Sequence, residues 1–236
     1  MVGTFRGAGW PCQGSRPHPA TSTIPIVFAS GGDPVGNGLV ASLARPGGNI
    51  TGLANLILEL SGKRLEFLTQ VIPGLRRVAF LLDVIGAASQ LQDMEAATQV
   101  LGVRLQVLEI REVPDYEAAF AAAGAEQADA LMMSSGINTP NSTRIISLAA
   151  RERLPAMYTN SQAVHHGGLM AYGTNRLDLH RRAATYVDKI LKGAQPADLP
   201  VEQPMRFDLA INLRTAQALG LTIPDQVLLQ ATEVTQ

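Results

Sequence analysis

A short apolar run that leads directly into small residues, an aspartate and a proline constrains this chain more than any other segment. Residues 24–29, IPIVFA, form a β-branched and aromatic run with little polar alternation, which is typical of a parallel strand covered on both faces. Residues 30–32 are Ser, Gly and Gly, and Asp33 and Pro34 follow. An aspartate at the N-cap and a proline at the first helical position favour a helix start. The segment therefore predicts a strand, a tight turn and a helix that begins at Asp33.

This junction is a candidate ligand-binding feature. In α/β proteins, ligands bind in the crevice beyond the carboxyl ends of the strands. The free N–H groups at the start of the predicted helix, the positive end of its dipole and the nearby hydroxyl of Ser30 would together stabilise an anionic or zwitterionic group. The alternative is that Asp33 only caps the helix.

Downstream of this segment, strand and helix patterns alternate, which favours βαβ units and a parallel sheet. The predicted strands are 77–82, 103–110, 130–133, 155–158 and 207–211. The predicted helices are 87–101, 115–124, 143–153, 177–191 and 215–219. We therefore expect an α/β fold whose strands are parallel.

Composition fits such a fold and excludes some functions. The chain has 236 residues, of which 46% are hydrophobic and 17% charged, enough to bury one large core or two small ones. A net charge of −1 argues against the basic surface of a nucleic-acid binder. No stretch approaches the roughly 18 uninterrupted apolar residues of a membrane span. The single cysteine, Cys12, has no second cysteine with which to form an internal disulfide or a metal site.

Several ordered sequence blocks identify a family resemblance. They are IPIVFASGGDPVGNGLVASLARPGGNITGL, ELSGKRLEFLTQVIPGLRRVAFLLD, RLPAMYTNSQAVHHGGLMAYG and RRAATYVDKILKGAQPADLPVEQPMRFDLAINLRTAQALGLTIP. From about Thr23 to the C-terminus, the chain resembles the ABC transporter substrate-binding proteins of the family that includes tryptophan- and tyrosine-binding uptake proteins. The resemblance implies a type I periplasmic-binding-protein fold, in which two α/β lobes close on a small ligand, and a membrane permease as partner.

The resemblance also implies how the chain is divided. Residues 1–22 are expected to be a disordered or non-family tail, and residues 23–75 a remnant of the first lobe. Residues 76–172 are expected to form the second lobe. Residues 173–236 would cross back to the first lobe and supply the C-terminal strand and helix. Because the resemblance implies further strand and helix units before Thr23, the first lobe is expected to be incomplete.

In such a fold, ligand contacts come from loops that follow the strands of both lobes. The predicted ligand-binding residues are Ser30, Gly32, Asp33 and Asn55 in the first lobe and Asp83, Ser89, Ser135, Asn160 and Tyr172 in the second. Each has a structural alternative: Asp83 can simply turn the chain, Ser89 can cap a helix and Tyr172 can be a packed side chain. In many relatives, the loop after residues 77–83 reads like Asn-Pro-x-Asn-Pro. Here it contains no side-chain amides, which leaves backbone amides and Ser89.

Catalytic patterns are scarce, so the sequence predicts a binding protein without a catalytic residue, a metal or a cofactor. His165 and His166 are adjacent, a spacing that does not make a metal pair and that favours loop or surface positions. Residues 31–36 match neither a phosphate-binding loop nor a dinucleotide fingerprint. One alternative is a Rossmann-like enzyme that uses a small molecule or a nucleotide, but this would require a paired acid and base. Another is the effector domain of a transcription regulator, although no helix-turn-helix pattern precedes Thr23.

The first 22 residues bear on localisation. They are rich in glycine and proline, lack the apolar core of a secretory signal peptide, and place Trp10 and Pro11 before Cys12, which makes a poor lipobox. A periplasmic location is therefore implied by the resemblance alone. The function we expect is that of a solute-binding component of an ABC importer, which binds an amino acid or a similar small polar metabolite and makes no contact with nucleic acid.

Overall fold

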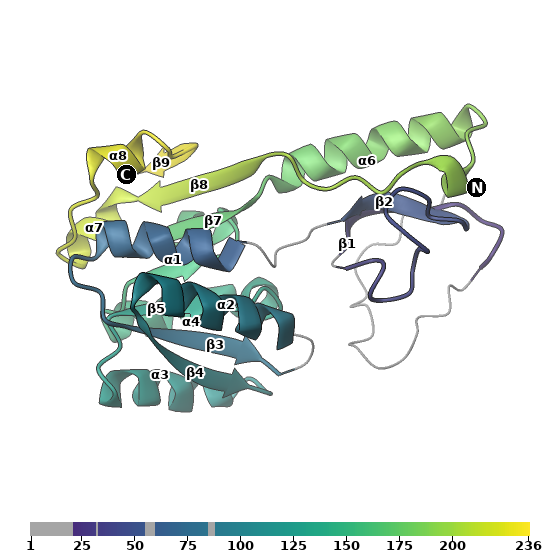
Figure 1. Ribbon diagram of the computed structural model, residues 1–236. Helices are drawn as coiled ribbons and strands as arrows, with labels where there is room; N and C mark the ends of the chain where they lie inside the picture. Colours follow the sequence, from purple (N-terminus) through teal and green to yellow (C-terminus); the bar gives the residue numbers. More distant parts are fainter. Residues whose placement is uncertain (1–20, 32, 55–59, 85–87) are drawn as a thin grey trace. The chain divides into compact units, whose positions relative to one another are not determined.

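The computed structural model describes residues 21–31, 33–54, 60–84 and 88–236, and it divides into two compact units (Figure 1). Unit 1 comprises Met1–Leu56 and Thr174–Phe207, and unit 2 comprises Ile57–Gly173 and Asp208–Gln236. The chain therefore passes from one unit to the other at residues 56/57, 173/174 and 207/208. Within the described parts of the chain, no helix is both long enough and apolar enough to cross a membrane.

Unit 1 is built on a two-stranded parallel sheet. Strand β1 (Ile26–Gly31) pairs with β2 (Ile50–Ala54), and the outer side of β2 forms a parallel bridge to Glu202. Both faces are covered. Helix α6 (Arg176–Leu191) packs on one face and contributes to a small apolar cluster. Leu39, Val40, Leu43 and Val201 pack on the other face, and a short 3₁₀ helix, η1 (Pro196–Asp198), contacts β2.

Strand β2 is not among the strands predicted from the sequence, and it has a glycine in its middle. Gly52 has φ +147°, and a Cβ built on it would lie 2.0 Å from the carbonyl oxygen of Phe28 on β1. The glycine is thus required by the close approach of the two strands and does not mark a break between elements. The register pairs Phe28 with Gly52 directly.

Unit 2 contains a seven-stranded sheet with the order β4-β3-β5-β6-β7-β8-β9. Its strands are β3 (Arg77–Asp83), β4 (Arg104–Ile110), β5 (Ala130–Met133), β6 (Ala156–Tyr158), β7 (Met170–Thr174), β8 (Phe207–Asn212) and β9 (Glu233–Thr235). Strand β3 pairs in parallel with β4 and with β5, β5 pairs in parallel with β6, and β6 with β7. Strands β8 and β9 also pair in parallel. Strand β8 runs against β7, since Asn212 N–H bonds the Leu169 carbonyl and Asn175 N–H bonds the Arg206 carbonyl.

Helices cover both faces of this sheet, and the side chains of β3 alternate between them. Val78, Phe80 and Leu82 join one apolar core, while Ala79 and Leu81 join the other. Side chains spaced three residues apart on α1 and α2 contribute to the first core. The first face is covered by α1 (Leu60–Val71), α2 (Ala88–Leu101), α7 (Leu213–Ala218) and α8 (Asp225–Leu228). The second is covered by α3 (Asp115–Ala125), α4 (Asn138–Arg151) and α5 (Gln162–His165) (Figure 1).

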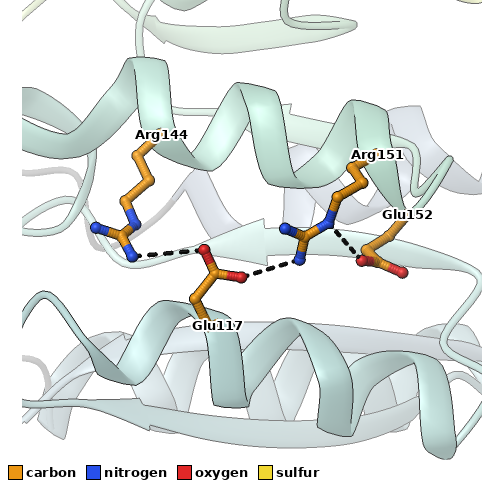
Figure 2. Close-up of polar contacts among 4 residues, drawn as sticks. All are labelled: Glu117, Arg144, Arg151 and Glu152. Atoms are coloured by element: carbon orange, nitrogen blue, oxygen red, sulfur yellow. Dashed lines mark hydrogen bonds and ion pairs between the residues drawn. The ribbon is translucent and has the colours of Figure 1, made fainter.

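On the second face, an ion-pair network joins α3 to α4. Figure 2 shows the carboxylate of Glu117 on α3 between Arg144 and Arg151 of α4. Arg144 Nη2 lies 3.4 Å from Glu117 Oε1, and Arg151 Nη2 lies 2.9 Å from Glu117 Oε2. Arg151 also contacts Glu152 through Nε at 2.9 Å. The network fixes the exposed sides of the two helices relative to each other.

The predicted α/β class with mainly parallel strands is confirmed, and the structure differs from the sequence interpretation in particular elements. Helix α1, within the segment assigned to the first lobe, lies in unit 2, and so do residues 208–236. The helix predicted to begin at Asp33 is wrong. Residues 34–38 form turns, and Gly38 has φ +67°, a backbone conformation that does not continue a right-handed helix.

Candidate functional site

The strand order of unit 2 creates a topological switch point between β3 and β5. From β3 the chain leaves into α2 on one face of the sheet, whereas from β5 it leaves into α4 on the other face. The loops after β3 and β5 thus diverge at the carboxyl ends of the strands. In open α/β sheets, ligands bind beyond the carboxyl ends of the strands at a switch point of this kind. The residues directly after β3 and β5 are therefore the first place to look for a functional site.

A hydrogen bond joins the ends of these two strands. Asp83, the last residue of β3, donates its backbone N–H to the Oγ of Ser134 at 2.9 Å. Ser134 is fully buried, and its own N–H donates to the Leu81 carbonyl at 2.9 Å. The carboxylate of Asp83 lies against Gly136, where an added Cβ would be 2.5 Å from Oδ2. Asp83 is thereby held at the mouth of the switch point, half-buried.

A glutamine that the sequence interpretation missed completes this cluster. Gln90 on α2 makes two hydrogen bonds to Ser135: its Nε2 donates to Ser135 Oγ at 2.9 Å, and its Oε1 accepts from Ser135 N–H at 2.9 Å. The sequence predicts site residues in the loops that follow strands, and Gln90 lies within a helix. Its two bonds fix the predicted site residue Ser135 beside α2.

Tyr116 lies behind Asp83 on α3 and is 2% exposed. Its hydroxyl oxygen accepts a hydrogen bond of 3.3 Å from Asn141 Nδ2. Burial raises the pKa of Tyr116, the bond from Asn141 opposes this rise, and the negative charge of Asp83 adds to it. The phenol therefore stays neutral at physiological pH and can act as a hydrogen-bond donor and acceptor, but not as a base.

Further along the same sheet edge, β6 and β7 bring two more predicted residues to the carboxyl end. Asn160 lies two residues after β6 and is partly buried. Tyr172 lies within β7, and its ring packs edge-on against Phe67 of α1 with 5.2 Å between the ring centroids. Its backbone carbonyl accepts a hydrogen bond of 2.7 Å from Arg64 Nε. The packed-side-chain alternative considered for Tyr172 thus describes its ring.

Tyr158, at the end of β6, points into the core. It is 1% exposed, burial raises its pKa strongly, and a Cβ at Gly168 would lie 2.6 Å from its ring. The side chain therefore serves packing, and the polar loop begins after it.

In unit 1, Asp33 is engaged with its own turn. Its Oδ1 accepts hydrogen bonds from Val35 N–H at 3.1 Å and Gly36 N–H at 2.9 Å. These amides were expected to hold an anionic ligand group at a helix start, and they are occupied by the Asp33 carboxylate itself. Ser30 is exposed within β1. The predicted residues Gly32 and Asn55 lie outside the described residues, and so does the side chain of Ser89.

The chemistry of this edge is that of hydrogen bonding. It offers a carboxylate, amides and hydroxyls, fixed by bonds to backbone and helix, which suits the orientation of a small polar molecule. Within the residues that the structure describes, no group of three or more His, Cys, Asp or Glu side chains is placed to hold a metal ion. His165, one of the adjacent histidines, is half-exposed and pairs with Glu233 through Nε2 at 2.5 Å.

Comparison with known protein families identifies the family of this chain. The model of the ABC transporter substrate binding protein family matches residues 14–235. The chain belongs to this family. The match begins within the segment that the sequence analysis set apart as a tail. The family match of this substrate-binding protein therefore covers nearly all of the residues that the structure describes.

Individual relatives agree with the family. A tyrosine-binding protein of Clostridioides difficile is 25% identical over 205 residues, which is 86% of this chain and 59% of the relative. The chain thus spans less than two thirds of the length of that curated relative. An ABC domain from Streptococcus pneumoniae, solved in complex with L-Trp, superposes with a TM-score of 0.81 at 25% identity, over 91% of this chain and 73% of that one. A conserved domain protein from Vibrio cholerae gives a TM-score of 0.82 at 29% identity, over 92% and 73%.

Proposed function

We propose that this substrate-binding protein is the solute-binding component of an ABC importer, and that its solute is an amino acid or a closely related small polar metabolite. The observation that carries the proposal is the polar cluster at the switch point of unit 2, where Asp83 ends β3 and Ser134 and Ser135 follow the adjacent strand β5. The relatives add support, since one is a tyrosine-binding protein and another was solved with L-Trp.

In this proposal, the partly buried carboxylate of Asp83 holds the ammonium group of the amino acid. An ammonium and a carboxylate form a charge-assisted hydrogen bond, which is about twice as strong as a neutral one. Ser135, Asn160 and Tyr172 supply further hydrogen bonds from unit 2. Ser30 and Asp33 do so from unit 1, where Asp33 would use the carboxylate oxygen that does not accept from the turn amides. The bound solute would then be delivered to a membrane permease, outside the cytoplasmic membrane.

The ligand is tested by binding measurements on the whole chain. A panel of the twenty amino acids should raise the melting temperature for at least one member, because a ligand that binds only the folded state stabilises it by mass action. Tyrosine and tryptophan are the first members of the panel to test, because one relative is a tyrosine-binding protein and another was solved with L-Trp. Isothermal titration should then give the affinity. If none of the panel and none of a set of small carboxylates binds, the proposed ligand class is wrong.

The role of Asp83 is tested by comparing ligands with and without the ammonium group. Asp83→Asn should weaken binding of an amino acid roughly 10- to 100-fold, as expected when a hydrogen bond to a charged group of about 1.5 to 3 kcal/mol is lost. It should leave the binding of the matching deaminated acid almost unchanged. An equal loss for both ligands would mean that Asp83 only shapes the loop.

We also propose that the protein binds its solute without converting it. The described residues supply hydrogen-bonding groups at the sheet edge, and the buried Tyr116 phenol has its pKa moved away from neutrality. Prolonged incubation of the chain with a confirmed ligand, followed by mass spectrometry, should return the ligand intact. A product that accumulates in proportion to protein would contradict this.

A further inference from the structure

Arg64 is a buried arginine that the proposed binding site does not use. It lies in the second turn of α1, is 2% exposed, and donates from Nε to the Tyr172 carbonyl at 2.7 Å. One of its terminal nitrogens, Nη2, is buried without a hydrogen-bond partner, and none of the ion pairs among the described residues includes Arg64. Arginine is almost never fully buried unless it is paired, so this position needs a reason.

The place of Arg64 in the chain supplies one. Helix α1 is the first element of unit 2 after the junction at residues 56/57, and Tyr172 lies one residue before the end of unit 2 at Gly173. The hydrogen bond therefore joins the two segments at which the chain enters and leaves unit 2. The register between β6 and β7 pairs Tyr158 with Ala171. Tyr172 is the next residue of β7, and its carbonyl accepts a hydrogen bond from helix α1.

Two further contacts fix the same two residues. The ring of Tyr172 packs edge-on against Phe67, one turn along α1 from Arg64, with a 63° angle between the ring planes. At Gly173 the backbone passes so close to the end of β6 that a Cβ would lie 2.0 Å from the Thr159 carbonyl oxygen. The chain is thus clamped from α1 at Tyr172 and from β6 at Gly173 directly before it leaves unit 2.

A charged group at this position is not explained by packing. Burial lowers the pKa of Arg64 to about 10, with Tyr172 opposing the decrease, so the guanidinium remains protonated at neutral pH. Burying that charge is costly, and an aliphatic side chain of similar length would fill the space without that cost. What only the guanidinium provides is a strong, directed donor to the Tyr172 carbonyl.

We propose that Arg64 is a positioning residue for solute binding, which fixes the point at which β7 leaves unit 2. With Tyr172 held to α1, β7 keeps its position up to Gly173, the last residue before the junction at residues 173/174. Without it, the end of β7 opens locally, and the residues after β6, which pass close to Gly173, lose their fixed position within unit 2. The consequence for affinity rests on the proposed binding function, whereas the consequence for β7 does not.

The test uses Arg64→Met and Arg64→Lys in the whole chain. Arg153→Met is the matched control, because exposed Arg153 also donates to a backbone carbonyl, that of Ala218 at 3.1 Å, away from the junctions. Hydrogen exchange followed by mass spectrometry should show at least tenfold faster exchange in residues 169–175 of Arg64→Met, with β3 and β5 unchanged. Arg64→Lys, which keeps a charged donor, should restore most of the protection, and Arg153→Met should leave this segment as in the wild type.

Solute affinity, measured on folded protein, should fall at least tenfold in Arg64→Met and recover in part in Arg64→Lys. Unchanged exchange in residues 169–175 would overturn the proposal, as would a uniform acceleration across unit 2 that Lys does not reverse. If Arg64→Met does not fold, Arg64→Lys decides: a lysine ammonium replaces the planar fork with one donor nitrogen of different reach, so exchange should still increase locally, and only in residues 169–175. Absence of any amino-acid binding by the wild type would contradict the proposed function, while the exchange result would still decide the role of Arg64.

Discussion

The backbone N–H of Asp83, the last residue of β3, donates a 2.9 Å hydrogen bond to the Oγ of Ser134, which directly follows the adjacent parallel strand β5. A side chain thus continues the ladder between β3 and β5 beyond the last paired residues, Leu81 and Met133. The effect is to hold the two loops together at the point where the chain diverges to opposite faces of the sheet. The carboxylate of Asp83 is positioned by this bond and by its contact with Gly136.

Ser134→Ala should therefore lower the free energy of unfolding by about 1 kcal/mol, since the Asp83 N–H loses its protein partner. Urea denaturation gives the difference. The control is Ser147→Ala, which removes an exposed hydroxyl that bonds the Thr143 carbonyl four residues earlier in the same helix and should change stability by less than about 0.5 kcal/mol. Equal effects of the two substitutions would show that the bond to Asp83 contributes nothing measurable.

Gly136→Ala should displace the Asp83 carboxylate and weaken amino-acid binding with little loss of stability. An added Cβ would lie 2.5 Å from Asp83 Oδ2, but a carboxylate can rotate away, whereas backbone cannot. Gly124→Ala is the control, because nothing lies within 4 Å of a Cβ there, and within a helix the change should stabilise by up to about 1 kcal/mol. Affinity that is unchanged in Gly136→Ala would separate the Asp83 carboxylate from solute binding.

Gly173→Ala should be far more damaging to the fold. Its Cβ would lie 2.0 Å from the backbone oxygen of Thr159, so β6 and β7 would have to separate locally, and overpacking of this kind costs about 1 to 3 kcal/mol or more. Thermal denaturation should show a clear decrease in melting temperature relative to the wild type. A melting temperature equal to that of Gly124→Ala would mean that this end of β7 is free to move.

The regular elements of unit 2 could be predicted because each carries its own periodic signal. The predicted strand 130–133 matches β5, and the predicted helix 177–191 begins one residue after α6 does. In α6, the side chain of Asn175 caps the helix by accepting from Asp178 N–H at 2.7 Å. Strand and helix patterns of this kind depend on local burial alone, so the sequence is sufficient to recognise them.

The prediction from sequence was wrong where residues nearby in the chain overrode a local helix-start signal. Asp33 and Pro34 carry a strong helix-start signal, but Gly36 and Gly38 follow, and the backbone turns instead. A Cβ at Gly36 would lie 2.2 Å from the Asp33 carboxylate, so a larger residue there would displace the side chain that bonds the turn amides. Gln90 was missed for a different reason: its two bonds to Ser135 depend on the packing of α2 against the end of β5, which no spacing within the sequence records.

The ion-pair network of Figure 2 gives a pH-dependent prediction. The hydrogen bond from Arg151 lowers the pKa of Glu117 below its ordinary value of 4.5, and Arg144 acts in the same direction. A carboxyl whose pKa is lowered in the folded state adds stability above its ordinary pKa and loses that contribution as the pH falls through the folded-state pKa. Glu117→Gln should therefore be slightly less stable than the wild type at pH 7 and equally stable well below pH 4.5.

Urea midpoints at pH 7 and pH 3 check this prediction, and 1 M salt at pH 7 should remove most of the difference, because exposed ion pairs are screened. Glu109→Gln is the control, since Glu109 pairs with the exposed Arg111 in a separate contact at 2.9 Å and does not join two helices. A difference between Glu117→Gln and the wild type that does not shrink as the pH falls from 7 to 3 would assign the effect to packing of the side chain and not to its charge.

The two sheets should also differ in local stability. Among the residues that the structure describes, strand β1 pairs only with β2 in a two-stranded sheet, whereas β3 and β5 lie inside the seven-stranded sheet with apolar cores on both faces. Because local opening is opposed mainly by buried contacts, amides of β1 and β2 should exchange at least tenfold faster than those of β3 and β5. Two causes contribute to this difference: the edge position of β1 and β2, and the smaller core of unit 1. Strand β4 separates them, because it lies at the edge of the larger sheet. Exchange in β4 as fast as in β1 would assign the difference to the edge, whereas slow exchange in β4 would assign it to the smaller core of unit 1.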